Sequence, residues 1–347
     1  MRILYIGQSN SMSTSLQRAN ALERIGHQVQ ILNPYDLISF FLESKYLRYF
    51  HYRTGYIFLQ KKMAAFTKEM VEKFQGKVDL IWVDNGELLG VNALNELKKL
   101  NSKILLYNID DPTGKRDAMR WRTLKRALFL YDGVAVVRNE NIKELEALHV
   151  SQDKIKRVFR SYDEVAHNPY ASLAQIPSIF HSDIVFLGTC IPGEGRGSFL
   201  RELIEAGLKV SIWGDGWEKD CHWQFLKSNW RGPSLIGRDY VAAIQGAKIC
   251  LGFLSKGNRD LHTTRSLEIP YAGGLLLAQR TSEHLDMYKE GVEAEFWDTS
   301  EECIEKCNLL LRDNLLRESI RASGMSRVRK LNLGHESVCK SILDSFQ

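Results

Sequence analysis

The chain has 347 residues, of which 44% are hydrophobic and 26% are charged, and its formal net charge is +5. This composition is typical of a globular protein and excludes a disordered chain, and no apolar run approaches the roughly 20 residues that a membrane-spanning helix needs. The length is too great for one ordinary hydrophobic core and predicts two domains. The small positive charge is compatible with an anionic substrate or a membrane surface, but it does not by itself predict nucleic-acid binding.

The six cysteines are scattered and include no C-x-x-C pair. Cys303 and Cys307 are spaced to share one helix face, but no further His or Cys motif completes a zinc site. Free thiols in a reducing compartment are therefore expected. The segment 1–7 is typical of a strand and too short for a secretory signal. The sequence thus favours a cytoplasmic protein, with the inner face of the membrane as the other expected location.

Residues 1–165 alternate short apolar runs with helix-like segments, which predicts a parallel sheet with helices on both faces. The expected strands are 3–6, 29–32, 80–83, 104–107 and 134–137. The expected helices are 13–25, 91–100, 115–130 and 139–148. The loop after the first strand starts at Gly7 and lacks the G-x-G-x-x-G pattern, which argues against a dinucleotide cofactor.

The segment 40–62 is unusually rich in aromatic and basic residues. One interpretation is a surface for a substrate or for lipid headgroups, because aromatic rings and cations together suit a membrane interface. The other interpretation is one or two helices that pack their aromatic face on the sheet. The sequence leaves both interpretations open.

Two acids, Asp110 and Asp111, follow the expected strand 104–107, and Pro112 stops that strand from continuing. Because ligands collect at the carboxyl ends of parallel strands, either acid is a candidate to bind a substrate hydroxyl or to act as a general base. The alternative is ordinary capping of the next helix by Asp111 or Thr113. The chain contains no D-x-D motif, which argues against a metal-dependent reaction.

Residues 166–182 contain two prolines and no periodic pattern, which predicts a linker between domains. A second α/β series follows. Its first strand runs into a glycine-rich loop, where Gly188 lets backbone N–H groups approach a phosphate and Arg196 could pair with it. The next strand ends at Trp213 and Gly214, a place that suits either contact with a planar base or a tight turn.

The segment 248–283 gathers ionisable residues at a junction between strand and helix. The apolar run 249–253 predicts a strand, and a polar loop then leads into a short helix. Gly273 and Gly274 are expected to end that helix before the next buried strand. In parallel α/β sheets, ligands bind where a strand turns into a helix.

Four side chains at this junction are candidates for binding or catalysis. Arg265 and Glu268 lie one turn apart on the expected helix, where the carboxylate suits two neighbouring sugar hydroxyls and the guanidinium suits a diphosphate. An exposed ion pair between them is the alternative. Asp260 and His262 lie in the preceding loop.

The run R-S-L-E-I-P-Y-A-G-G-L-L-L-A, residues 265–278, resembles the nucleotide-sugar segment of GT-B glycosyltransferases, especially the CgeB-like group. Related retaining enzymes have a Glu-x7-Glu signature at this place. Asp260 and Glu268 have the same spacing, so the second acid matches and the first is one methylene shorter. CgeB-like proteins also have a similar Asp-Asp-Pro after a strand, and a glycine loop with an arginine at the start of their second domain.

The resemblance implies two Rossmann-like domains facing each other across a cleft, the GT-B arrangement, with the C-terminal helices crossing back to the first domain. The expected boundaries are 1–165 for an acceptor-binding domain, 166–182 for the linker, 183–330 for the donor domain and 331–347 for a helix that packs on the first domain.

The resemblance also implies metal-independent transfer of a sugar from a UDP-, GDP- or dTDP-sugar to a polysaccharide, a glycolipid or another glycan. Glu268 would bind the ribose, and Arg196 and Arg265 the diphosphate. Close approach of the nucleotide would use Gly188, Trp213, Gly214, Gly273 and Gly274. The sugar would face Asp260 or His262, and the acceptor would face Asp110 or Asp111.

Two other functions remain open. A nucleotide-sugar epimerase of the same fold would bind the same donor without an acceptor. A non-catalytic protein that binds nucleotide sugars or glycans would keep the nucleotide site and lack the chemistry, and the shortened acid at Asp260 is compatible with it.

Overall fold

The computed structural model describes residues 1–11 and 13–346, which form two compact units with one six-stranded sheet each. Unit 1 comprises Met1–Phe159, Gly257–Arg259 and His335–Gln347, and unit 2 comprises Arg160–Lys256 and Asp260–Gly334. Within the described residues, no helix combines the length and apolar character needed to cross a membrane.

The sheet of unit 1 is fully parallel, with the strand order β2-β1-β3-β4-β5-β6. The strands are β1 (Arg2–Ile6), β2 (Gln28–Leu32), β3 (Leu80–Asp84), β4 (Lys103–Asn108), β5 (Gly133–Val136) and β6 (Ile155–Arg157). The central strands β3 and β5 are buried along their whole length, because helices cover both faces of the sheet.

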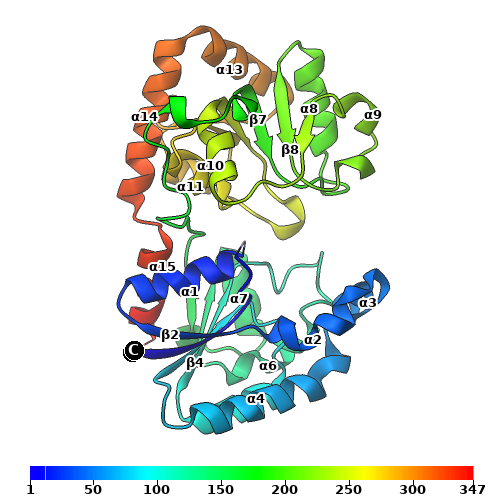
Figure 1. The fold of residues 1–347 in the computed structure, drawn as a ribbon, viewed down its shortest axis with the longest axis vertical. Helices are drawn as coiled ribbons and strands as arrows, with labels where there is room; N and C mark the ends of the chain where they lie inside the picture. Colours follow the sequence, from blue (N-terminus) through cyan, green and yellow to red (C-terminus); the bar gives the residue numbers. More distant parts are fainter. Residues whose placement is uncertain (12, 347) are drawn as a thin grey trace. The chain divides into compact units, whose positions relative to one another are not determined.

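The helices of unit 1 include the last one in the chain, which returns after unit 2. They are α1 (Thr14–Arg24), α2 (Pro34–Glu43), α3 (Lys45–Thr54), α4 (Gln60–Phe74), α5 (Val91–Leu97), α6 (Arg122–Ala127), α7 (Asn139–Ala147) and α15 (His335–Ser345). Helix α15 packs beside α1, as Figure 1 shows, and the Glu336 carboxylate accepts from Arg24 Nε at 2.5 Å.

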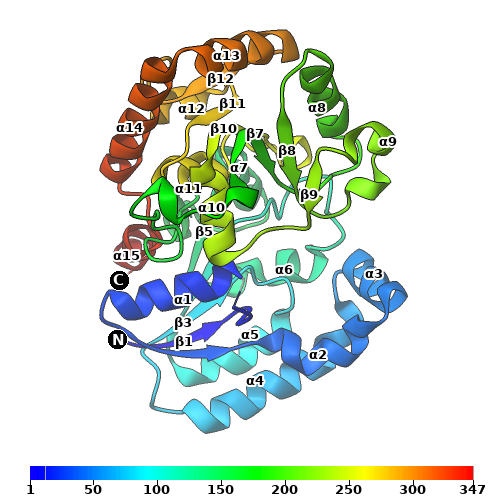
Figure 2. The same cartoon turned by 45° about the horizontal axis from the view of Figure 1, so that its top comes forward.

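The sheet of unit 2 is also parallel, with the strand order β12-β11-β10-β7-β8-β9 (Figure 2). The strands are β7 (Ser182–Leu187), β8 (Val210–Trp213), β9 (Trp230–Gly232), β10 (Ala247–Gly252), β11 (Leu276–Gln279) and β12 (Glu295–Trp297). The chain moves outward from β7 to one edge through β8 and β9, and then to the other edge through β10. The order therefore reverses between β7 and β10, the point where open α/β sheets bind ligands.

Seven helices flank this sheet within the described residues. They are α8 (Arg196–Glu205), α9 (Trp223–Leu226), α10 (Gly237–Gly246), α11 (Arg265–Tyr271), α12 (Ser282–Met287), α13 (Ser300–Arg312) and α14 (Asn314–Leu331). One face of the sheet packs a core that joins residues of β7, β8 and β10 to α8 and α13. Helix α8 begins after the loop that follows β7, and helix α11 begins after the loop that follows β10.

The two parallel sheets confirm the predicted fold class. The sequence did not predict the edge strands β6, β9 and β12, because each has only three residues and no periodic pattern can be read over that length. The helix expected at 115–130 is shorter: α6 starts at Arg122, and the preceding residues form turns in which the Tyr52 hydroxyl donates to Asp117 at 2.7 Å.

Candidate functional site

The candidate site of unit 2 lies at the carboxyl ends of β7 and β10, where the strand order reverses. The ten-residue helix α8 starts at this edge of the sheet, and α11 starts after the loop that follows β10. Unpaired backbone N–H groups and the helix dipole make the first turn of α8 favourable for negative charge.

Arg196 is the first residue of α8, and its side chain is buried. Its guanidinium donates to Glu194 Oε2 at 2.7 Å and to the carbonyls of Thr189 and Leu254 at 2.9 and 3.1 Å. Burial lowers the pKa of Arg196, and the neighbouring charge of Arg265 lowers it further against the opposing effect of Glu194. The Nε–H of Arg196 is buried and has no hydrogen-bond partner in the described chain.

Arg265 opens α11, and its Nε–H is likewise buried without a partner among the described residues. Its positive charge acts to lower the pKa of both Arg196 and Tyr240, so Arg265 lies near both side chains. The surface ion pair with Glu268, the alternative interpretation of the sequence, is absent from the ion pairs of the described residues. Two neighbouring guanidinium groups with unused N–H donors form a site that suits an anion.

Glu268 is 6% exposed and lies in the first turn of α11. One oxygen, Oε2, accepts from the Tyr240 hydroxyl at 2.7 Å, and burial followed by the Glu268 charge raises the pKa of that tyrosine well above its usual value. The other oxygen, Oε1, is 3.7 Å from Nε2 of His167. Because His167 Nδ1 accepts from the Asp163 backbone, its Nε2 carries the proton that faces Glu268.

Neither Tyr240 nor His167 was predicted from the sequence. Tyr240 lies on the inner side of an ordinary amphipathic helix, α10, and His167 lies in the segment expected to be a linker. Only the tertiary fold brings them to Glu268, so no local pattern identified them.

Asp260 is buried, and its carboxylate accepts from Nη2 of Arg160 at 3.1 Å. Its backbone N–H donates to the Ser255 carbonyl at 3.2 Å. Asp260, the first acid of the Asp-x7-Glu pattern, is therefore engaged in an ion pair with Arg160. The sequence analysis did not single out Arg160. Asp260 is thus held in the same unit as Glu268 but is joined to a different partner.

His262 is 2% exposed, and both of its ring nitrogens are engaged. Nε2 accepts from the backbone N–H of Arg160 at 3.0 Å, so Nδ1 carries the proton and donates to Glu283. This arrangement favours a role in holding the loop before α11 over direct contact with a sugar.

A second buried histidine, His284 of α12, supports α11 from the other side. Its Nδ1–H donates to the Gln279 carbonyl at 2.6 Å and its Nε2 accepts from the Ser266 hydroxyl at 2.7 Å. The ring stacks on Phe296 with centroids 5.3 Å apart. His262 and His284 therefore fix the loop and the first turn that present Arg265 and Glu268.

Gly188 and Gly214 lie at the ends of β7 and β8, and their backbones pack against each other. A Cβ at Gly214, where φ is +153°, would lie 2.0 Å from the Gly188 carbonyl oxygen. The indole of Trp213 is buried and packs beside Phe180 and over Gly232, rather than standing open at the strand end. The glycines thus permit close packing of the two strand ends, which is a structural reason for their presence.

Gly273 and Gly274 end α11 instead of lining its start. Gly273 has φ of +81°, and its N–H donates to the Pro270 carbonyl at 3.0 Å. A Cβ at Gly274 would lie 2.6 Å from Ile244 Cγ2. Because α11 runs away from the carboxyl ends of the strands, these glycines lie next to the amino end of β11, and helix termination explains them without a ligand.

Asp111, in unit 1, is tightly bound by neighbouring side chains. Its two oxygens accept from Arg259 Nε and Nη2 at 2.8 Å each, and Oδ1 also accepts from Asn141 at 2.8 Å. Burial acts to raise the pKa of Asp111, but the hydrogen bonds from Arg259 and Asn141 outweigh it and lower the pKa. A carboxylate held in its charged form in this way is a poor proton acceptor.

Asp110 is more accessible, with 31% of its side chain exposed. Its carboxylate lies 3.2 Å from Nη1 of Arg120, which also pairs with the buried Glu87. The Tyr35 hydroxyl donates to Glu87 as well. Glu87 follows β3 and Asp110 follows β4, so this second polar cluster, which the sequence did not predict, lies at the carboxyl edge of the sheet of unit 1.

Over residues 1–11 and 13–346, no group of three or more His, Cys, Asp or Glu side chains is arranged to hold a metal ion.

Comparison with known proteins identifies the class of unit 2. Residues 196–336 match the family model described as "Glycosyl transferase-like". This segment is therefore similar to a glycosyltransferase domain. No curated protein sequence gave a significant match.

Solved structures show that the GT-B fold extends over the whole chain. Anabaena Alr3699/HepE, crystallised with UDP-glucose, is 13% identical, and the match covers 99% of each chain with a TM-score of 0.69. Sucrose-phosphate synthase from Thermosynechococcus elongatus is 13% identical over 99% of this chain and 98% of its own, with a TM-score of 0.71. A Listeria monocytogenes protein assigned as a UDP-N-acetylglucosamine 2-epimerase is 10% identical over 96% and 95%, with a TM-score of 0.54.

These findings support a transferase of the GT-B fold, with the glycosyltransferase-like domain on the unit that contains Arg196, Arg265 and Glu268. None of these matches is to a CgeB-like protein. At 10–13% identity, the structural matches establish the fold and not the substrate.

The buried His284 predicts that unit 2 loses stability in mild acid. Burial lowers the pKa of His284 from 6.5 to about 4, so between these pH values the unfolded chain binds a proton that the folded chain does not. The free energy of unfolding therefore falls as the pH is lowered through this window, by about 3 kcal/mol at pH 4 from this residue. Denaturant unfolding followed by tryptophan fluorescence at several pH values measures the effect. His284→Gln, which does not titrate, should have a shallower pH dependence, and equal slopes would contradict the prediction.

Proposed function

We propose that this protein transfers a sugar from a nucleotide-sugar donor to a glycan-type acceptor without a metal ion, and that unit 2 binds the donor. The main support is the pair of neighbouring guanidinium groups of Arg196 and Arg265, with buried and unused N–H donors, next to the buried carboxylate of Glu268. A nucleoside diphosphate presents the complementary groups, because its phosphates suit the two guanidinium groups and its ribose hydroxyls suit the carboxylate.

Each donor contact follows from the chemistry of its partner. Arg196, Arg265 and the first turn of α8 offer N–H groups and positive charge to the diphosphate. Glu268 keeps Oε1 as an acceptor for ribose hydroxyls, because Tyr240 occupies only Oε2. As the bond to the sugar breaks, negative charge grows on the leaving diphosphate, and the same arginines stabilise it without a metal.

In unit 1, we assign the acceptor side to the cluster around Asp110. Asp110 is the better candidate for general base because it is partly exposed, whereas Asp111 is held ionised by Arg259 and Asn141. Glu87 and Arg120 would position Asp110 and hydrogen-bond to acceptor hydroxyls. Asp260 and His262 are then positioning residues in unit 2, because Arg160 joins both of them.

UDP is the first donor nucleotide to test, because HepE, which shares the fold, was crystallised with UDP-glucose; GDP and dTDP remain the other expected nucleotides. We retain the CgeB-like group as the expected subfamily and a polysaccharide or a glycolipid as the expected acceptor, both on the resemblance of residues 265–278.

The fold shared with the Listeria protein makes an epimerase the second candidate. Incubating the protein with UDP-N-acetylglucosamine alone separates the two: an epimerase converts the free donor to an isomeric sugar, whereas a transferase only hydrolyses it slowly. Binding of the nucleotide with neither reaction would instead indicate a non-catalytic protein.

Glu268→Gln should weaken nucleotide binding without unfolding unit 2, because it keeps the size of the side chain and removes the charge that accepts from the ribose. UDP at 100 times its dissociation constant should stabilise the wild-type protein by about 2.7 kcal/mol, visible as a rise of several degrees in Tm. We expect an affinity loss of about tenfold or more in the variant, measured by calorimetry.

Arg265→Ala should weaken binding of UDP but leave binding of uridine unchanged, whereas Glu268→Gln should weaken both. The exposed Glu205→Gln, which alters only a surface pair with Arg201, serves as the matched control. If Glu268→Gln and Arg265→Ala bind UDP as tightly as the control does, the donor site is wrongly assigned.

Asp110→Asn should reduce hydrolysis of the bound nucleotide sugar, in which water replaces the acceptor, by roughly 10²–10⁴-fold while UDP affinity stays constant. Asp111→Asn should instead lower thermal stability, because the neutral amide no longer forms an ion pair with Arg259. Rates measured by release of UDP test both expectations. A fully active Asp110→Asn protein would exclude this residue as the base.

The segment 40–62 forms an exposed surface that we propose contacts anionic lipid. The rings of Phe40, Tyr46, Tyr49, Phe50 and Phe58 are exposed on and after α2 and α3, so the alternative of an aromatic face buried on the sheet does not describe them. Five Lys and Arg residues lie in the same segment, against the single acid Glu43. Exposed rings and cations together favour the interface of an anionic bilayer, as expected at the inner face of a membrane.

Sedimentation with lipid vesicles tests this surface. The protein should bind vesicles that contain phosphatidylglycerol, bind pure phosphatidylcholine vesicles weakly, and dissociate as salt is raised. The triple change Phe40→Ser, Tyr49→Ser and Phe58→Ser should abolish binding. Phe129→Ser, at an exposed ring outside the segment, should not, and equal binding by both variants would refute the proposal.

A further inference from the structure

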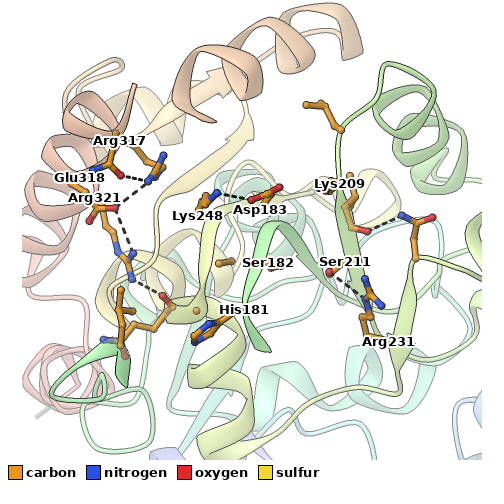
Figure 3. Close-up of a pocket in the computed structure, with 18 residues that line it drawn as sticks. His181, Ser182, Asp183, Lys209, Ser211, Arg231, Lys248, Arg317, Glu318 and Arg321 are labelled. Atoms are coloured by element: carbon orange, nitrogen blue, oxygen red, sulfur yellow. Dashed lines mark hydrogen bonds and ion pairs between the residues drawn. The ribbon is translucent and has the colours of Figure 1, made fainter. Parts of the chain in front are cut away.

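A cavity of about 700 Å³ lies in unit 2 at the amino ends of β7, β8 and β10, the opposite edge of the sheet from the candidate donor site. Figure 3 shows its walls: the starts of these strands form the middle, β9 one side and helix α14 the other. A volume of this size accommodates a small organic molecule.

The lining is strongly basic. It contains five Lys and Arg side chains and two carboxylates, which gives a net charge of +3 with His181 neutral. Such a concentration of one sign in a concave surface attracts anions.

The cations of the α14 side are largely occupied. Arg317 donates to the Leu310 carbonyl at 2.9 Å, and Arg321 donates to the Gln245 carbonyl at 2.7 Å. Lys248 pairs with Asp183 at 2.7 Å. These contacts tie α14 and the strand ends together, so they explain the position of these residues without a ligand.

Lys209 and Arg231 differ, because neither forms an ion pair with any described residue. Arg231 Nε contacts only the Ser211 hydroxyl, at 3.4 Å, and Figure 3 places both residues on the β8–β9 side of the cavity. At the centre of the lining, the hydroxyl of Ser182 is buried and has no hydrogen-bond partner among the described residues. Buried hydroxyls usually have one, so the cavity floor contains an unsatisfied polar group.

The remaining lining indicates which anion fits. No Phe, Tyr or Trp side chain contributes to the walls, so a nucleobase would find only the imidazole of His181 as a ring on which to stack. Hydroxyl and amide groups of Ser182, Ser211 and Asn229 are present instead, and these suit the hydroxyls of a sugar.

We propose that this cavity binds a phosphorylated sugar or a closely similar small organic phosphate, with Lys209 and Arg231 on the phosphate and the polar groups of Ser211 and Asn229 on sugar hydroxyls. The site is separate from the candidate donor site, and it does not depend on the proposed function.

Calorimetric titration of the full chain with glucose 1-phosphate, glucose 6-phosphate and inorganic phosphate tests the proposal. We expect saturable binding of at least one sugar phosphate, tighter than that of inorganic phosphate. The double variant Lys209→Ala, Arg231→Ala should bind at least about tenfold more weakly, because each cation supplies a charge-assisted hydrogen bond. Lys219→Ala, Lys227→Ala removes two exposed lysines outside the cavity and should bind as the wild type does.

Two further measurements separate this site from the donor site. Sugar-phosphate binding should persist in Arg265→Ala, and Lys209→Ala, Arg231→Ala should keep the UDP affinity of the wild type. Circular dichroism verifies that each variant is folded. Absence of binding by both sugar phosphates, equal affinity in the double variant and the wild type, or loss of binding in Arg265→Ala would each overturn the proposal. Equal affinity for inorganic phosphate would overturn its sugar specificity.

Discussion

The repulsion between two cations, the buried Arg196 and the partly buried Arg265, is the constraint around which the candidate site of unit 2 is arranged. Burial and the charge of Arg265 both lower the pKa of Arg196, and the carboxylate of Glu194 opposes this shift. A buried cation without a counterion costs free energy, and an anion bound from outside removes that cost. The backbone N–H groups in the first turn of α8 also favour a negative charge at this place. Positive charge therefore collects at the point where the strand order reverses, which favours a negatively charged group there.

The neighbouring carboxylate must be kept in place without neutralising these cations. Glu268 achieves this because its partners, Tyr240 and His167, are neutral donors rather than cations. The start of α11 is in turn fixed by two histidines whose nitrogens are all used: His262 bridges the Arg160 backbone and Glu283, and His284 bridges Ser266 and Gln279. A short helix of seven residues has little stability of its own, so these contacts determine where Arg265 and Glu268 point.

The sequence predicted the fold class and most central strands, because strands buried on both faces read as continuous apolar runs. The sequence also placed Arg196, Arg265 and Glu268 in one region, because each lies on the helix that comes after such a strand and its loop. Tyr240, His167 and Arg160 have no comparable signal: they reach the site only through tertiary packing, two of them from the segments around the expected linker. The glycines show the converse. Gly273 and Gly274 resemble a ligand-binding pair in sequence, yet a positive φ and contact with Ile244 account for them at the end of α11.

The two neighbouring aspartates show how a distant residue decides the chemistry of a local motif. The sequence around Asp110 and Asp111 does not distinguish the two acids, because both follow the same buried strand. Arg259, far along the chain, donates two hydrogen bonds to Asp111 and lowers its pKa, so that acid holds its proton only at low pH. Asp110 shares Arg120 with Glu87 and keeps solvent access. A base must exchange its proton with substrate and solvent in each turnover, which favours Asp110.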